Sequence, residues 1–129
     1  MKRVTLTALA ILVPSLSLAD PLRIEETKDL MEACKDVDRF QRSNKTTEDM
    51  LSTGADSLKC VCYLYGFLGG YMETRLAVGA PRAICPRKGV SGEQLAAVYV
   101  RWASQHPELW HLPSWRTVNM ALRDAFPCE

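Results

Sequence analysis

The stretch from Ser91 to Cys128 constrains the fold most, because it contains the start and stop signals of two consecutive helices. Ser91 and Gln94 have the spacing of a capping box, in which each side chain accepts from the other residue's backbone N–H. The residues that follow are apolar at helical spacing: Leu95, Val98, Tyr99 and Trp102. Pro107 predicts the end of this first helix, since proline disfavours helical backbone in the residue before it.

A second helix is predicted after the connection. Ser114 is placed to cap it, and Pro127 predicts its end. Its apolar stripe consists of Val118, Ala121, Leu122 and Ala125. Cys128 follows just beyond this helix, where it can be tied to another element. Everything upstream is therefore expected to pack on this pair of helices.

The N-terminus has the features of an export signal. Lys2 and Arg3 are followed by a short apolar run, and Ser17-Leu18-Ala19 places small residues where a signal peptidase cuts. The run is shorter than the roughly 20 apolar residues of a membrane span, which argues against an uncleaved anchor. We therefore predict a signal peptide over residues 1–19, one helical domain over 20–129 and a periplasmic location, with no membrane association after cleavage.

Charge excludes some classes of partner. The 129-residue chain has a formal net charge of +1, which becomes −1 when Lys2 and Arg3 are removed. Such a balance gives no electrostatic reason to bind nucleic acid or a membrane surface.

Five cysteines remain after the predicted cleavage. In an exported small domain they indicate a disulfide framework with one cysteine left over. The preferred pairs are Cys34 with Cys60 and Cys85 with Cys128, the second because antiparallel final helices would return Cys128 beside Cys85. They would close segments of 26 and 43 residues, worth roughly 3.5 and 4 kcal/mol of stability. Cys62 would be left over, although the sequence alone does not fix the pairing.

Two further helices are expected upstream. Thr27 is placed to cap the first, whose stripe contains Leu30, Cys34 and Val37 and is widened by neighbours that include Phe40. The polar segment Arg42–Gly54 is interpreted as an exposed loop, with one helical turn near Met50 at most.

The second of these helices is expected from Asp56 or Ser57 through Met72. It is apolar nearly all round, as a helix at the centre of a bundle would be. Gly66 and Gly70 lie one turn apart, which predicts close approach of another helix. The fold class expected is all-α: a small, four-helix bundle-like domain stapled by disulfides.

Catalytic and cofactor motifs are missing from the sequence. His106 and His111 are five residues apart across a proline, and the Cys and His spacings of zinc sites are absent. A thiol hydrolase built on Cys62 would need a partner histidine in a partly exposed, electropositive site. We therefore expect no enzyme activity, no cofactor and no metal.

Several short motifs resemble the Rap/Tai group of periplasmic immunity proteins. They are the run Cys60–Phe67, Ile84-Cys85-Pro86, Gln94-Leu95 with Val98, His106-Pro107-Glu108 and the closing Ala121–Cys128. The resemblance spans roughly residues 30–128 and fits Cys34, Cys60, Cys85 and Cys128 to framework positions. Cys62 departs from the pattern.

The resemblance implies a four-helix domain that neutralises a peptidoglycan amidase delivered by type VI secretion. The amidase would be its protein partner, and the domain could also form a homodimer. The competing hypothesis is a periplasmic helical binding protein such as an acid-stress chaperone of the HdeA type. The partner contacts are predicted in the last connection, at Glu108, Trp110 and His111, because aromatic and polar groups together favour binding hot spots. The alternative is that Trp110 and Leu112 only cover the end of the bundle.

Overall fold

The described part of the chain consists of helices. The computed structural model describes residues 23–37 and 46–129, apart from the side chains of residues 48–50 and 52. Within these ranges it contains α1 (Thr27–Cys34), α3 (Thr47–Ala77), α4 (Gly92–Gln105), the short 3-10 helix η1 (Pro107–Leu109) and α5 (Ser114–Ala125). No strand occurs in them beyond two isolated bridges, so the all-α prediction is confirmed. The predicted signal peptide and Phe40 lie outside the described residues.

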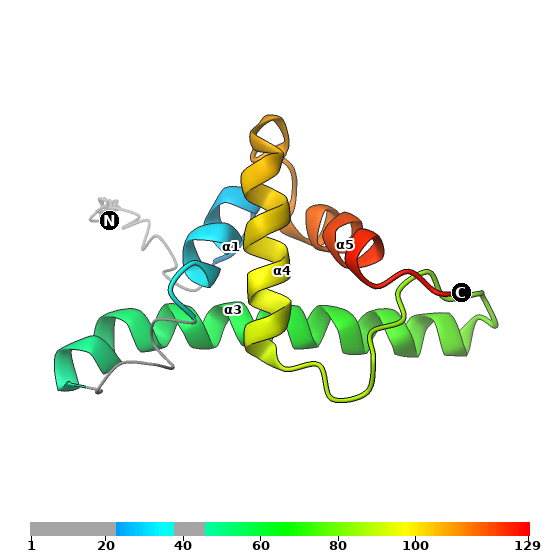
Figure 1. Cartoon of the computed structure of the whole chain (residues 1–129), viewed down its shortest axis with the longest axis horizontal. Coiled ribbons are helices and arrows are strands. Elements are labelled where there is room, and N and C mark those ends of the chain that lie inside the picture. Colours follow the sequence, from blue (N-terminus) through cyan, green and yellow to red (C-terminus); the bar gives the residue numbers. More distant parts are fainter. Residues whose placement is uncertain (1–22, 38–45) are drawn as a thin grey trace, which may run out of the picture.

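The long helix α3 forms one side of the domain. Figure 1 shows α1, α4 and α5 together on one side of α3, with α4 crossing it steeply and both ends of α3 extending beyond the crossing. The core lies where these four helices meet. Its largest fully buried apolar side chains are Tyr99, Leu30, Leu64, Ile84, Leu95, Leu122 and Val118.

Helix α4 begins and ends as predicted. The Ser91 backbone N–H donates to Gln94 Oε1 at 3.0 Å, and the Gln94 N–H donates to Ser91 Oγ at 3.3 Å. The helix ends at Gln105, two residues before Pro107. This capping box satisfies two backbone donors that a helix start otherwise leaves unpaired.

The predicted caps of α1 and α5 are wrong. Glu26 and Pro113 are the residues that precede these helices, while Thr27 and Ser114 are the first helical residues and are fully buried. Their hydroxyls donate to carbonyl oxygens across the domain, Thr27 to Leu112 at 2.9 Å and Ser114 to Glu26 at 2.6 Å. Each hydroxyl belongs to a residue within the helix and not to the residue before it, so it does not cap that helix. The tertiary contacts of both residues therefore decided what their hydroxyls bind.

Helix α3 begins earlier than predicted. It starts at Thr47, so the part of the Arg42–Gly54 segment from Thr47 onward is helical and not a loop. The acidic residues that made this segment resemble a loop occupy the first turn, where negative charge is favoured by the helix dipole. Arg42 to Lys45 lie outside the described residues.

The predicted central position of α3 is also wrong. Its inner side packs on the core through Cys60 and Leu64, but a Cβ added at Gly66 or Gly70 would meet nothing within 4 Å. These glycines therefore do not serve close helix packing. The close approach occurs at Gly92 instead, where an added Cβ would lie 2.7 Å from Val61 Cγ1.

The domain contains two disulfides, and they are the two pairs preferred from the sequence. Cys34–Cys60 joins α1 to α3, and Cys85–Cys128 joins the segment before α4 to the C-terminus. Beside the second bond, the Cys85 N–H donates to the Phe126 carbonyl at 2.8 Å. Cys62 is free and exposed.

Candidate partner-binding surface

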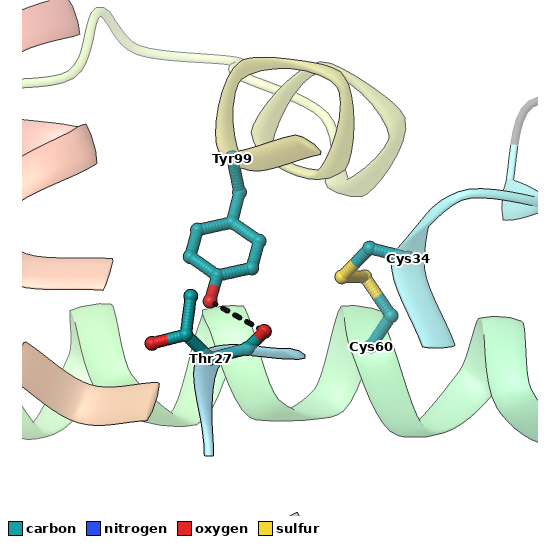
Figure 2. The surroundings of a disulfide bond; sticks show 4 residues. All are labelled: Thr27, Cys34, Cys60 and Tyr99. Carbon is teal, nitrogen blue, oxygen red and sulfur yellow. Dashed lines mark hydrogen bonds between the residues drawn. A yellow bond between two sulfur atoms is a disulfide. The ribbon is translucent and has the colours of Figure 1, made fainter. Parts of the chain in front are cut away.

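A buried hydroxyl cluster fixes the start of α1 against α4 and α5. Tyr99 on α4 donates from its hydroxyl to the Thr27 carbonyl oxygen at 3.3 Å, beside the Cys34–Cys60 disulfide (Figure 2). The Tyr99 hydroxyl also lies 3.2 Å from Thr117 Oγ1, which is 2.8 Å from Thr27 Oγ1. Burial raises the pKa of Tyr99 to about 12, with the hydrogen bonds to the two threonines acting in the opposite direction.

The connection between α4 and α5 is held by the start of α1 through main-chain bonds. The Thr27 N–H donates to the Leu112 carbonyl at 2.9 Å, and the Lys28 N–H donates to the Trp110 carbonyl at 3.3 Å. In return, the Ser114 N–H donates to the Glu25 carbonyl at 2.9 Å. The connection thereby satisfies the first backbone donors of α1, which lack partners within that helix. Its own conformation is fixed by the same bonds.

The side chain of Trp110 is part of this anchoring. Its indole N–H donates to the Ala103 carbonyl at 2.9 Å, near the end of α4, and the ring is half-buried. This contact gives Trp110 a structural role at the end of the helices, as the covering hypothesis expected.

Glu108 and His111 lie on the outside of the same connection, and both are exposed. We call residues 106–112 the tip, because Figure 1 shows this segment protruding at the top of α4, away from α3. Glu108 Oε1 lies 3.2 Å from His106 Nδ1. The pKa of the Glu108 carboxyl is lowered, first by its own backbone N–H and then by the His106 side chain. The tip thus presents a carboxylate beside the imidazole of His106.

The structure therefore places the three predicted contact residues in one connection, with Glu108 and His111 exposed on its surface and Trp110 as an anchor. Whether they bind a partner stays a prediction. The sequence reasoning missed a second exposed surface, on the side of α3 that faces away from the core. The signal was present in the sequence, since a helix that is apolar all round needs cover on every side.

No metal site or membrane span is found in residues 23–37 and 46–129. There, no three His, Cys, Asp or Glu side chains converge as a metal site would require. No helix in the same ranges is long and apolar enough to cross a bilayer.

The fold and the tip define a class: a small, disulfide-bonded helical protein that presents an anchored connection at one end of its helices. The chain belongs to the Rap1a immunity protein family, whose family model matches residues 26–128. This match confirms the family suggested by the short motifs. The matched region begins at Glu26, the residue that caps α1, and it includes both disulfides. Comparisons with curated proteins and with solved structures gave no match.

Proposed function

We propose that this protein binds and inhibits a peptidoglycan amidase that a type VI secretion system delivers, and that it has no catalytic activity of its own. The observation that carries the proposal is the match to the immunity family across every described helix. An immunity protein works by occupying its toxin, so it needs a shaped and rigid surface and no reacting groups.

The tip is the surface that we propose for toxin binding. It is convex, which suits insertion into the substrate groove of an amidase. Its backbone is fixed before binding by the bonds from Thr27, Lys28 and the Trp110 indole. A preorganised loop loses less conformational entropy on binding, so more of its contact energy is available as affinity.

Glu108 is the side chain expected to contribute most to recognition. It is the only acidic residue between Arg101 and Asp124. Because its pKa is lowered, the carboxyl is charged at neutral pH and remains so in mildly acidic solution. A carboxylate at the end of a protruding loop can accept hydrogen bonds from donors in a concave site.

We infer a periplasmic location from three features. The family is one of immunity proteins, the described residues contain two disulfides, and the first 19 residues have the pattern of a signal peptide. Disulfides persist in an oxidising compartment such as the periplasm. Peptidoglycan, the substrate of the proposed toxin, lies in the same compartment.

The test uses the oxidised chain Asp20–Glu129 and the secreted peptidoglycan amidases encoded near its gene. One amidase is expected to form a stoichiometric complex with the chain and to stop releasing fragments from purified peptidoglycan. The variant carrying Glu108→Ala and His111→Ala is expected to bind at least about tenfold more weakly, as hot-spot truncations do. Its circular dichroism should be unchanged, because both side chains are exposed.

Glu129→Ala is the matched control, since it removes an exposed carboxylate at the far end of the chain. Full inhibition by the double tip variant would show that the tip is not the binding surface. If no amidase is inhibited, and instead many proteins bind weakly below about pH 3–4, where carboxylates protonate, the acid-chaperone hypothesis would replace this proposal.

A further inference from the structure

A pocket lies between the start of α4 and the end of α5. Its volume is about 590 Å³, and its apolar lining consists of Val90, Ala97, Val98, Ala125 and Phe126. Sites for small molecules have volumes of about 300–1,000 Å³ and are lined mostly by apolar side chains. The pocket therefore has the size and the lining of a ligand site, and the toxin contacts proposed at the tip do not use it.

The walls of the pocket are held together by covalent and main-chain bonds. The Cys85–Cys128 disulfide joins the segment before α4 to the chain that follows α5. The Cys85 N–H donates to the Phe126 carbonyl at 2.8 Å, and Ile84 and Pro127 form an isolated bridge. These bonds hold Phe126 beside the segment that leads into α4. The pocket is thus formed before a ligand binds, and a ligand does not have to order its walls.

Two cations stand on a tight turn at the edge of the pocket. Arg87 and Lys88 line the pocket, and both are exposed. The Val90 N–H donates to the Arg87 carbonyl at 3.3 Å, and Gly89 between them has a φ of +89°. Glycine adopts this backbone conformation without the strain that a side chain would add. The Val90 carbonyl accepts from the Tyr65 hydroxyl at 3.3 Å, which ties the turn to α3.

The charge around the pocket has one sign. Residues 74–92 contain four cations and no acidic residue. No acidic residue is among the described residues that line the pocket. Asp124, next to the lining residue Ala125, accepts a hydrogen bond from the Trp102 indole N–H at 2.8 Å. An apolar pocket with a cationic edge is complementary to a ligand that has an apolar body and a negatively charged end.

The lining favours a hydrocarbon chain over a peptide. Among the described residues that line the pocket, Gln94 has the only uncharged polar side chain, and its side-chain oxygen accepts from the Ser91 N–H. A peptide in the pocket would leave most of its buried amide groups without hydrogen-bond partners, which has a desolvation cost. A hydrocarbon chain has no such groups, and it gains free energy by leaving water.

We propose that this pocket binds a free fatty acid, a single aliphatic chain that ends in a carboxylate. The chain lies against Val90, Val98 and Phe126, and the carboxylate pairs with the guanidinium of Arg87 and the ammonium of Lys88. Fatty-acid binding is separate from toxin binding. Figure 1 places the start of α4 and the tip at opposite ends of that helix, so an occupied pocket leaves the tip accessible.

The test is isothermal titration calorimetry of the oxidised chain Asp20–Glu129 with sodium decanoate below its micelle concentration. One saturable site is expected. Decanoate should bind at least about fourfold more tightly than octanoate, because each buried methylene group strengthens binding about two- to fourfold. Decyltrimethylammonium has the same chain and the opposite charge, and it should bind at least about tenfold more weakly than decanoate. In NMR spectra, decanoate should shift the methyl signals of Val90 and Val98.

Three variants test the assignment of the residues. Arg87→Gln combined with Lys88→Gln should weaken decanoate binding about tenfold and remove the preference for decanoate over decyltrimethylammonium. Ala97→Glu should weaken it at least as much, because it adds a negative charge at an exposed position of the lining. Lys28→Gln combined with Arg116→Gln is the matched control, since it removes the same charge from two exposed side chains outside the pocket. This control should bind decanoate as the original chain does.

Several results would overturn the proposal. They are absence of decanoate binding, equal affinity for decyltrimethylammonium, and unchanged binding by the Arg87 and Lys88 double variant. Binding to vesicles of phosphatidylglycerol and phosphatidylcholine without binding of free decanoate would assign the surface to a membrane instead. Tighter binding of a short acidic peptide with an apolar end would make it a peptide site. Amidase inhibition by the tip is measured separately, so either proposal can fail without the other.

Discussion

Gly92→Ala should destabilise the protein, although alanine is ordinarily the better helix former. The new Cβ would lie 2.7 Å from Val61 Cγ1 and 3.2 Å from Tyr65 Cε2. Carbon atoms in contact are normally about 3.5–4.0 Å apart, so α4 must move away from α3 or Val61 must leave its rotamer. Such overpacking costs about 1–3 kcal/mol. The higher helix propensity of alanine offsets less than about 1 kcal/mol of this cost, because Gly92 is the first residue of α4 and not an interior one.

The expected net loss is about 1–2 kcal/mol, or a fall in melting temperature of about 5–15 °C for a domain of this size. The assay is thermal and urea unfolding followed by circular dichroism, with the disulfides intact. Val61→Ala in the same chain should recover part of the loss, because it removes the atoms that the new methyl group meets. The two changes should therefore show a coupling energy of about 1 kcal/mol or more.

Gly70→Ala is the matched comparison. It lies inside α3 with nothing within 4 Å of its Cβ position, so the same substitution should stabilise the helix by about 0.5–1 kcal/mol. A Gly92→Ala variant as stable as the original chain, or one that shows no coupling to Val61→Ala, would refute the argument from close contact.

Two further predictions concern the core. The phenol of Tyr99 has a pKa of about 12 in the folded chain, against 10.0 for the free side chain. The folded state therefore gains stability from the neutral phenol below about pH 10, and this contribution is lost as the pH rises through 12. The effect on the free energy of unfolding is about 2–3 kcal/mol. Tyr99→Phe should flatten this part of the stability curve, and an unchanged alkaline slope in urea unfolding would contradict the assignment. Replacing both cysteines of Cys85–Cys128 by serine should lower the free energy of unfolding by about 4 kcal/mol, and replacing those of Cys34–Cys60 should lower it by about 3.5 kcal/mol. The difference arises because the two bonds close segments of 43 and 26 residues. Equal stability of the reduced and oxidised chains would contradict this prediction.

Sequence patterns predicted the structure correctly where the interacting residues are near one another in the chain. The capping box at Ser91 and the proline at position 107 predicted the start and end of α4 because both act within one turn of the chain. The apolar stripes predicted buried residues of α1 and α5 for the same reason: spacing along a helix decides which residues share a side. Ala125 is the exception, because the predicted stripe of α5 included it and it is exposed at the last position of the helix. The match of the family model to residues 26–128 agrees with motifs that were also local.

Sequence patterns gave wrong predictions where a segment distant in the sequence binds the same side chain. Thr27 and Ser114 have the residue types of helix caps, yet both hydroxyls are buried and bond to carbonyl oxygens 85 and 88 residues away in the sequence. The boundaries of α3 were misplaced because polar residues can begin a helix as well as form a loop. Gly66 and Gly70 suggested close packing, but only the position of α4 shows that Gly92 is the glycine in contact.

The sequence by itself determined the helical class, the start and end of α4 and the family, because helical periodicity, caps and short motifs are properties of neighbouring residues. Only the tertiary structure decided which side of α3 faces the core and which residues anchor the tip. The physical reason is that burial and hydrogen-bond partners depend on what the rest of the chain places nearby. An apolar helix can be covered on any side, and here the chain covers α3 on one side and leaves the other exposed.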